Sequence, residues 1–308
     1  MKSTPPKNVA HSVRDRLLKL ARSRQEDFNF VLVRYFLERL LYRISRSPHE
    51  AEFILKGAML FMVWSKHAYR ATKDLDLLGS GTPDLDRLVR VFREVAVLPV
   101  EDDGIVFDPA RVQARRIKED AEYEGVRVTL EGRLGSAKLA LQVDVGFGDS
   151  VTPAPTTIDF PTLLPFPSPI IRAYARETVV AEKLHAMVDL GMANSRMKDF
   201  FDVWFLSTEF EFQGVALGNA IRATFERRQT PIPEEAPAAL TEAFALNAAK
   251  QSQWSAFLGR SAVAVGPKLT LPEVVAAIAP FLIPAIEEAL SGGSIQATWP
   301  PGGQWIFR

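Results

Sequence analysis

Prolines gather in one segment of this chain and divide it into two parts of different character. Between Pro153 and Pro169, six of the 17 residues are proline. Proline lacks a backbone N–H and fits neither a helix interior nor a central strand. Before this segment, helix-like and strand-like stretches alternate, whereas nearly every stretch after it is typical of a helix. The pattern predicts an α+β fold with a small mixed sheet, N-terminal helices and a helical C-terminal domain.

This division suggests three regions. Residues 1–48 are expected to form basic helices that pack on the core. Residues 49–152 are expected to form the core domain with the sheet. Residues 153–308 combine the proline-rich crossover, the helical domain and an extended tail that its aromatic residues pin down.

Apolar periodicity and turn residues give the expected elements. Helices are predicted at 8–25, 28–48, 58–65, 82–97, 176–191, 197–208, 213–228, 236–258 and 271–290. Strands are predicted at 53–55, 73–78, 104–117, 126–131 and 138–145, with a hairpin turn at 132–135.

Composition excludes several classes of site. There is no cysteine, which rules out disulfides and cysteine-ligated zinc. The four histidines are widely scattered, so a histidine-rich metal site is not expected. No apolar stretch is expected to be long enough for a membrane span, and the N-terminus lacks a signal-peptide pattern, so a cytoplasmic protein is predicted.

Positive charge is concentrated near the N-terminus although the formal net charge is zero. Residues 1–48 contain eleven Lys and Arg against four Asp and Glu. Such a surplus suits a polyanionic partner, and it equally suits two helices whose arginines face water. Charge alone leaves both interpretations open.

Two carboxylates in the predicted strand 73–78 form a candidate metal pair. Side chains alternate between the faces of a strand, so Asp74 and Asp76 point the same way while Leu75 and Leu77 point into the core. Two carboxylates about 7 Å apart can bridge a pair of Mg²⁺ ions, as phosphoryl transfer requires.

Asp144 is a candidate third acid in the strand 138–145. Val143 and Val145 face one side of that strand and Asp144 faces the other. If the strand lies beside Asp74 and Asp76, Asp144 could deprotonate an attacking hydroxyl or hold a second metal. A solvated strand end explains it equally well.

Gly57 follows a short buried strand and begins a predicted helix, 17 residues before Asp74. Backbone N–H groups at such a turn can bind phosphate, and a side chain there would block its approach. Lys56 and Arg70 supply positive charge that suits a triphosphate, and Ala58 completes the turn. A plain turn is the alternative.

Two further candidates lie in the predicted helices after the prolines. Lys183 flanks an apolar stripe in helix 176–191, so its amine either has a partner or reaches out to water. Arg196, Asp199 and Asp202 share one face of the next helix. Asp199 could orient Lys183 or a nucleotide, or it could simply stabilise the start of the helix.

As a set, these motifs resemble the AbiEii family of nucleotidyltransferase toxins, which includes the MenT toxins. In chain order they are Lys-Gly-Ala-Met-Leu at 56–60, Arg-x-Thr-x-Asp-Leu-Asp at 70–76, Val-Asp-Val-Gly-Phe-Gly-Asp at 143–149, Glu-Lys-Leu-His-Ala at 182–186 and Lys-Asp-Phe-Phe-Asp at 198–202. The resemblance covers about residues 50–205. It implies a polymerase-β-like nucleotidyltransferase core at 49–152, which the helical domain completes.

The resemblance also implies roles. Asp74 and Asp76 match the family's metal-binding pair, and Asp144 matches the acid of its third motif. Lys183 and Asp199 match the later catalytic lysine and aspartate. Gly57 matches the phosphate-binding turn, with Ala58 standing where the family usually has a hydroxyl. Mg²⁺ and a nucleoside triphosphate are the expected cofactor and substrate, and an AbiEi-type antitoxin is the expected partner.

Some members of the family add nucleotides to the 3′ end of tRNA. The resemblance therefore predicts a Mg²⁺-dependent nucleotidyltransferase that moves a nucleoside monophosphate to an RNA 3′-hydroxyl, with tRNA as the expected acceptor, and thereby blocks translation. Two alternatives remain open. The acceptor could be a hydroxyl of a protein or small molecule, or the chain could bind a nucleotide or a partner without catalysis.

Overall fold

The chain, seen in a computed structural model, divides into two compact units. The structure describes residues 8–65, 72–118, 124–260, 269–292 and 296–307. Residues 1–148 and 156–173 form one unit, which we call the sheet unit. Residues 149–155 and 174–308 form the other, the helical unit. The proline-rich segment thus contributes to both.

The sheet unit is built on a seven-stranded mixed sheet with the strand order β3-β4-β5-β2-β1-β7-β6. β2 runs parallel to β5 and β1 parallel to β7, and the other neighbours are antiparallel. The elements are α1 (Val9–Arg24), α2 (Phe28–Arg46), β1 (Phe53–Lys56), α3 (Leu60–Trp64), β2 (Asp74–Gly79), α4 (Leu85–Ala96), β3 (Ile105–Lys118), β4 (Glu124–Leu134), β5 (Ala137–Phe147), β6 (Thr156–Asp159) and β7 (Ile170–Ala173). The α+β class is confirmed, and the sheet is larger than expected.

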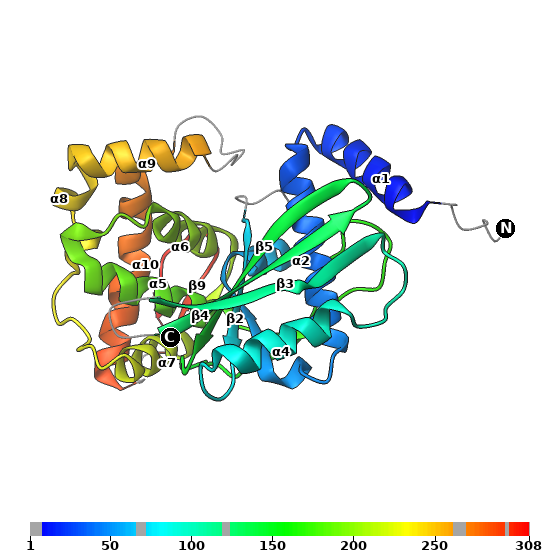
Figure 1. Ribbon diagram of the computed structural model, residues 1–308. Coiled ribbons are helices and arrows are strands. Elements are labelled where there is room, and N and C mark those ends of the chain that lie inside the picture. The colour runs from blue at the N-terminus through cyan, green and yellow to red at the C-terminus, as the bar shows by residue number, and fades with distance from the viewer. Residues whose placement is uncertain (1–7, 66–71, 119–123, 261–268, 293–295, 308) are drawn as a thin grey trace. The chain divides into compact units, whose positions relative to one another are not determined.

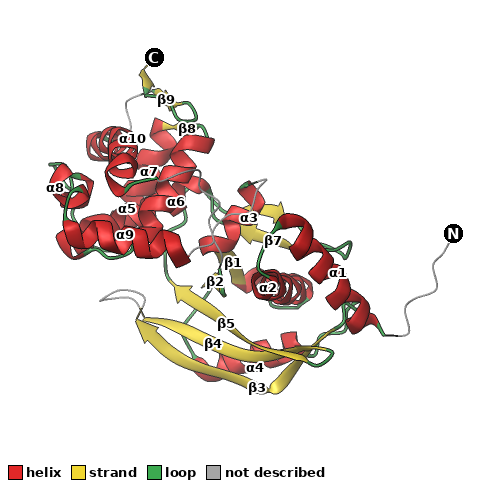
Figure 2. Ribbon diagram, turned by 90° about the horizontal axis from the view of Figure 1, so that it is seen from above, coloured by secondary structure: helices red, strands yellow, loops and turns green. Residues whose placement is uncertain are grey.

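One face of this sheet carries the core. α4 packs along β3 and β4, and α2 packs against β5 and β7 (Figures 1 and 2). Strand alternation supplies the apolar side chains beneath these helices, because every second residue in the central parts of β2, β4 and β5 is buried. Leu75, Leu77, Val126, Val128, Val143 and Val145 are the central ones. The opposite face, here called the outer face, carries the polar residues of the same strands.

The hairpin between β4 and β5 turns later than predicted. β4 runs on through Gly132 to Leu134, and the turn lies at Gly135 and Ser136, where Gly135 has a φ of +58°. Gly132 is not a turn residue but a packing residue, since a Cβ there would lie 2.7 Å from the ring of Phe36. The prolines behave as expected, because the strand within their segment, β6, lies at the edge of the sheet.

Charged residues of α2 lie inside the sheet unit, so the interpretation in which the arginines of both N-terminal helices face water does not hold for α2. Arg39 and Arg43 are almost fully buried and both bind the Asp103 carboxylate. Arg39 Nε donates to it at 3.0 Å, and Arg43 donates through both terminal nitrogens at 2.7 and 3.1 Å. Part of the N-terminal positive charge therefore holds α2 to the start of β3.

Glu38 belongs to the same buried cluster. Its carboxylate accepts the backbone N–H of Leu163 at 2.7 Å and lies 3.4 Å from Arg39. Burial raises the pKa of Glu38 to about 7, although the bonds from Leu163 and Arg39 act in the opposite direction. Glu38 thus changes charge near neutral pH inside the fold.

The helical unit consists of α5 (Arg176–Leu190), α6 (Met197–Glu209), α7 (Gly214–Arg227), α8 (Glu242–Ala245), α9 (Ala248–Arg260) and α10 (Leu271–Ser291), with three short strands, β8 (Phe212–Gln213), β9 (Ala297–Trp299) and β10 (Ile306–Phe307). The single helix predicted at 236–258 is divided. Thr241 accepts the N–H of Phe244, and Asn247 accepts those of Ala249 and Lys250. Such side chains start new helices and so interrupt a longer one.

Aromatic residues fasten the tail, as predicted. Trp305 stacks on Phe281 with ring centroids 6.0 Å apart, and its indole N–H donates to the Phe281 carbonyl. Trp299 Nε1 donates to the carbonyl of Ser207 at 2.8 Å.

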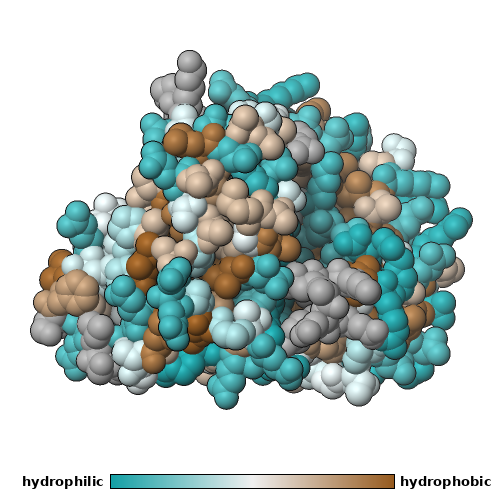
Figure 3. All heavy atoms as spheres, turned by 90° about the vertical axis from the view of Figure 1, so that its left-hand side faces the viewer, coloured by the Kyte–Doolittle hydropathy of each residue, from teal (hydrophilic) through white to brown (hydrophobic). Residues whose placement is uncertain are grey.

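In Figure 3, which views the side where α8 and α9 stand in Figure 1, apolar side chains form patches separated by polar ones.

α10 corrects the expectation about membrane spans. Its 21 residues have a mean hydropathy of 1.7 in the most apolar window, so length and composition alone would let it cross a membrane. Half of that window is buried within the structure, and the helix packs against α6 and α7. α10 therefore serves as a core helix of the helical unit.

Replacing Glu38 with Gln should change how stability depends on pH. A carboxyl whose pKa rises from 4.5 to about 7 on folding destabilises the fold progressively as pH increases between those values. Glu38→Gln removes this destabilisation. The free energy of unfolding of the variant, relative to that of wild type, should therefore increase by roughly 3 kcal/mol between pH 4.5 and pH 8. Calorimetric unfolding at several pH values measures this, and parallel pH curves for the two proteins would contradict it.

Candidate active site

Four charged residues form a row across the outer face of the sheet. Lys56 of β1 pairs in register with Asp76 of β2, Asp76 pairs with Asp144 of β5, and Asp144 pairs with Arg127 of β4. Register partners on neighbouring strands project from the same face. The row thus reads positive, negative, negative, positive. Asp74 lies on the same face, two residues before Asp76.

The structure places Asp144 beside the Asp74 and Asp76 strand, but it turns the Asp144 carboxylate toward a residue that the sequence did not indicate. Arg127 Nε donates to one Asp144 oxygen and Arg127 Nη2 to the other, both at 2.8 Å. Gln142 adds a bond of 3.3 Å. Hydrogen bonding to Asp144 raises the pKa of Arg127, outweighing partial burial, and the charges of Asp144, Asp74 and Asp76 act in the same direction.

Gly57 lies against Asp76. It starts a 3₁₀ turn directly after β1 and has a φ of +72°, which strongly favours glycine. A Cβ at this position would lie 1.9 Å from Asp76 Oδ2. The glycine therefore lets the turn approach the carboxylate, a stronger constraint than the plain turn left open by the sequence.

The neighbours of Gly57 differ in their surroundings. Lys56 is 8% exposed and stands in register with Asp76, which brings positive charge to the row. Ala58 is buried at 6% exposure. Arg70, the third predicted nucleotide-binding residue of this region, lies outside the described residues.

Lys183 and Asp199 meet in a second cluster, within the helical unit. Lys183 Nζ of α5 donates to Asp199 Oδ1 of α6 at 2.8 Å and lies 2.6 Å from Asp202 Oδ2. Both aspartate side chains are fully buried, whereas that of Lys183 is 14% exposed. Arg196 Nε lies 2.7 Å from the other Asp199 oxygen. Of the two alternatives for Lys183, the structure shows the one in which its amine has partners.

The charge state of Asp199 follows from these contacts. Burial acts to raise the pKa of Asp199, but the positive charges of Lys183, Arg196 and Lys198 outweigh it and hold the pKa below its ordinary value. Asp199 is therefore ionised at neutral pH. Asp202, which the sequence indicated only as a neighbour on the same helix face, is the second anion that holds Lys183.

Comparison with known proteins identifies the family. The model of the AbiEii family, described as the nucleotidyl transferase AbiEii toxin of type IV toxin–antitoxin systems, matches residues 39–291. That range is most of the chain. The protein belongs to the AbiEii family. It is accordingly a nucleotidyltransferase of the toxin class, and the family implies a nucleotide substrate and an antitoxin partner.

Other comparisons add little. No curated protein matches. Two crystal structures from Helicobacter pylori have similar folds: JHP933 and a putative nucleotidyltransferase, each 13% identical. They cover 86% of this chain and 95% and 98% of their own, with TM-scores of 0.49 and 0.47.

The carboxylates fit a magnesium ion that arrives with its nucleotide. Among the described residues, no three His, Cys, Asp or Glu side chains gather as a metal-binding group. Mg²⁺ is commonly held by one or two carboxylates, with substrate phosphates and water completing its shell. Asp74 and Asp76 can supply those carboxylates, whereas the hydrogen bonds from Arg127 and Gln142 occupy Asp144.

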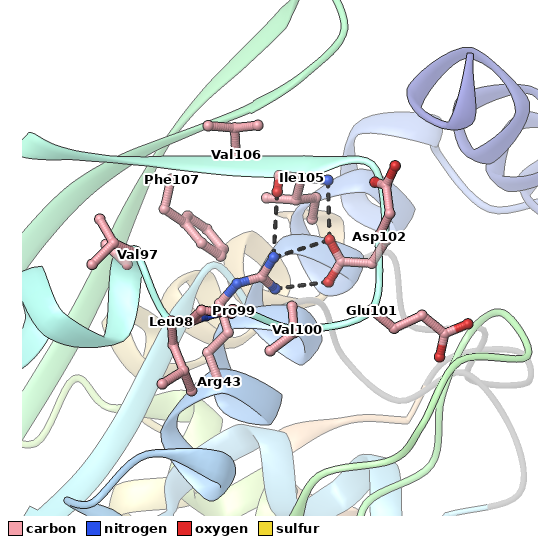
Figure 4. A pocket seen from close by; sticks show the side chains of 12 residues that line it. Arg43, Val97, Leu98, Pro99, Val100, Glu101, Asp102, Ile105, Val106 and Phe107 are labelled. Atoms are coloured by element: carbon pink, nitrogen blue, oxygen red, sulfur yellow. Dashed lines mark hydrogen bonds and ion pairs between the residues drawn. The ribbon is translucent and has the colours of Figure 1, made fainter. Parts of the chain in front are cut away.

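A pocket of about 390 Å³ elsewhere in the sheet unit is a poorer candidate. It lies between the end of α4 and the start of β3 (Figure 4). Its walls are mainly apolar, and its arginine, Arg43, already binds Asp103 and the Ile105 carbonyl. None of the predicted site residues lines it.

Replacing Gly57 with Ala should impair nucleotide transfer by displacing Asp76. The added methyl group collides with the carboxylate, and a displacement of about 1 Å in a catalytic group can cost roughly 10²-fold in rate. Gly81→Ala is the matched control, because Gly81 has a φ of +82° and its Cβ would meet only Arg87 Nη1, at an ordinary contact distance of 3.8 Å. Transfer of labelled nucleotide is measured for both variants, and equal rates would exclude the proposed contact.

Replacing Lys183 with Met should destabilise the helical unit. The change leaves Asp199 and Asp202 buried without their shared cation, which costs about 3–5 kcal/mol when both are ionised. The loss should shrink at low pH, because the charge of Lys183 helps to lower the pKa of Asp199, and without it that carboxyl takes up a proton more readily. Lys198→Met is the control, since Lys198 is exposed on the same helix. Similar unfolding free energies for both variants would contradict the assignment.

Proposed function

We propose that this AbiEii protein is a Mg²⁺-dependent nucleotidyltransferase that transfers a nucleoside monophosphate from a triphosphate to the 3′-hydroxyl of an RNA, with tRNA as the expected acceptor. Such transfer would block translation by preventing aminoacylation at the 3′ end of the tRNA. The observation that carries the proposal is the shared outer face of Asp74 and Asp76, with Gly57 packed against Asp76. Nucleotides and tRNA both occur in the cytoplasm, where we expect the protein to act.

The reaction follows the chemistry of phosphoryl transfer. The acceptor hydroxyl oxygen attacks the α-phosphorus, the bond from that phosphorus to the oxygen bridging to the β-phosphate breaks, pyrophosphate leaves, and the hydroxyl proton passes to solvent. Asp74 and Asp76 would hold a Mg²⁺ ion, which would neutralise charge on the phosphates. Gly57 leaves room for the Asp76 carboxylate and for an anion at the backbone of the turn.

An exposed basic helix supports a polyanionic acceptor. Arg39 and Arg43 of α2 are buried in ion pairs and do not face solvent. The exposed positive charge of the N-terminal region is therefore mainly that of α1. Its exposed basic side chains are Arg14, Lys19, Arg22 and Arg24. Lysine and arginine side chains in such an arrangement bind phosphate groups of a nucleic acid without reading its sequence. The catalytic roles of Lys183 and Asp199 are part of the proposal and rest on the family motifs.

Replacing Asp74 with Ala should abolish transfer while the fold persists, because Asp74 is half-buried on the outer face rather than part of the core. The purified protein is incubated with each labelled nucleoside triphosphate, Mg²⁺ and total RNA, or with lysate stripped of RNA. Label is expected on RNA, and transfer by Asp74→Ala is expected to fall below about 10⁻² of wild type. Asp86→Ala, an exposed acid of α4, is the control that should retain activity.

The distribution of label separates the competing functions. Label on protein or on a small molecule instead of RNA would replace the proposed acceptor. Triphosphate binding without pyrophosphate release would show a nucleotide-binding protein without catalysis. Wild-type transfer by Asp74→Ala would overturn the assignment of the site.

A further inference from the structure

Arg127 uses only one edge of its guanidinium group for Asp144. A guanidinium carries five N–H donors in a fixed plane. Two of them, on Nε and Nη2, point at the two oxygens of Asp144, each at 2.8 Å. Within the described part of the chain, these are the hydrogen bonds that Arg127 makes. The remaining donors, including both on Nη1, are available to a ligand.

The position of Arg127 makes those donors accessible. Its side chain is 26% exposed, compared with 14% for Asp144. Arg127 is separated from Asp76 by one strand, so their backbones lie about 10 Å apart on one face. Arg115 of β3 stands in register with Arg127 on the same face and is also exposed. The positive end of the row therefore continues beyond the carboxylates.

The oxygens of Asp144, by contrast, are largely occupied by hydrogen-bond donors, which leaves little room for a metal ion. Its carboxylate accepts the two bonds from Arg127 and one from Gln142. A bidentate pair of this kind fixes the plane of both partners. The contact that Asp144 makes in the structure is one that orients an arginine.

We infer that Arg127 is a phosphate-binding residue of this site, and that Asp144 acts as its positioning residue and not as a third metal ligand. This inference rests on the proposed function. The ligand chemistry is a phosphate oxyanion, presented either by the nucleoside triphosphate or by a phosphodiester of the acceptor RNA. Arginine suits either source, because its free N–H groups can form paired bonds to two phosphate oxygens.

Binding measurements on full-length variants test the role of Arg127 and identify the source of the phosphate. Affinity is measured for an α,β-methylene nucleoside triphosphate, with Mg²⁺ and with EDTA, and for a single-stranded oligoribonucleotide. Arg127→Gln should lower the affinity for one of these two ligands about 10- to 100-fold. If that ligand is the triphosphate, the loss should appear in EDTA as well as in Mg²⁺. Arg127→Lys, which keeps the charge without the fork, should recover only part of the loss.

Arg133→Gln is the matched control. Arg133 lies on the same strand and the same outer face, six residues away, and pairs with Glu131 at 3.1 Å. Its removal changes the net charge equally, so it should alter binding by less than about twofold. Equal losses of affinity in Arg127→Gln and Arg133→Gln would mean that Arg127 acts only through its contribution to the net charge, and would overturn the inference.

A double-mutant cycle tests the role of Asp144. Asp144→Asn should lower the affinity for the same ligand as Arg127→Gln does. In a chain that already carries Arg127→Gln, it should lower that affinity little further. If Asp144→Asn instead weakens Mn²⁺ binding, measured by electron paramagnetic resonance with the triphosphate analogue, in both backgrounds, Asp144 is a metal ligand and the inference fails. Thermal unfolding of each variant verifies the fold, and Arg127→Lys still decides the matter if Asp144→Asn does not fold.

The same data separate failure of the inference from failure of the proposed function. A wild-type protein that binds neither triphosphate nor RNA contradicts both. A wild-type protein that binds and transfers nucleotide, with Arg127→Gln indistinguishable from it, contradicts only the inference about Arg127.

Discussion

The parallel pairing of β2 with β5 is the contact on which the outer-face site depends. It joins segments that are nearly 70 residues apart in the chain and sets Asp76 opposite Asp144. A shift of one residue in this register would turn one of the two carboxylates into the core, because side chains alternate between faces. The shift is opposed by the apolar residues of the strand that would move, since either Leu75 and Leu77 or Val143 and Val145 would then face solvent. The core packing thus holds the acids in line.

Buried charges make a second contribution to both units. In the sheet unit, Asp103 joins Arg39 and Arg43, and in the helical unit Lys183 joins Asp199 and Asp202. Such groups are costly to remove from water, and they are tolerated when every charge has a close, well-oriented partner. Their arrangement fixes where helices can lie: α2 is held against the start of β3, and α5 against α6. Geometry of this kind is what a reaction centre needs from its surroundings.

Local patterns in the sequence were enough to predict the strand of Asp74 and Asp76, the glycine turn and most helices. Alternation and helical periodicity are local properties, and the buried apolar positions follow them. The charged residues of α2 were misplaced because their partner, Asp103, lies about 60 residues further on and no local pattern announces it. The helix at 236–258 was predicted as continuous because apolar periodicity outweighed Thr241 and Asn247 as helix starts.

Arg127 was missed because of the hairpin turn. A turn centred on 132–135 sets Asp144 opposite residue 123, whereas the observed turn at Gly135 and Ser136 sets it opposite Arg127. In a hairpin, a displacement of two residues in the turn moves every cross-strand partner by four. Glycine at 132 suggested the turn, yet it is there to accommodate the ring of Phe36.

The order of charges in the row explains how the site can exist before any ligand arrives. Asp76 and Asp144 are direct neighbours on parallel strands, and like charges at that spacing destabilise a sheet. Each has a cation as its other neighbour, Lys56 for Asp76 and Arg127 for Asp144. The protein therefore balances the charges of Asp76 and Asp144 with its own residues. Removing one end of the row would leave two adjacent anions with one cation, which is why the two flanking residues belong to the site as much as the acids do.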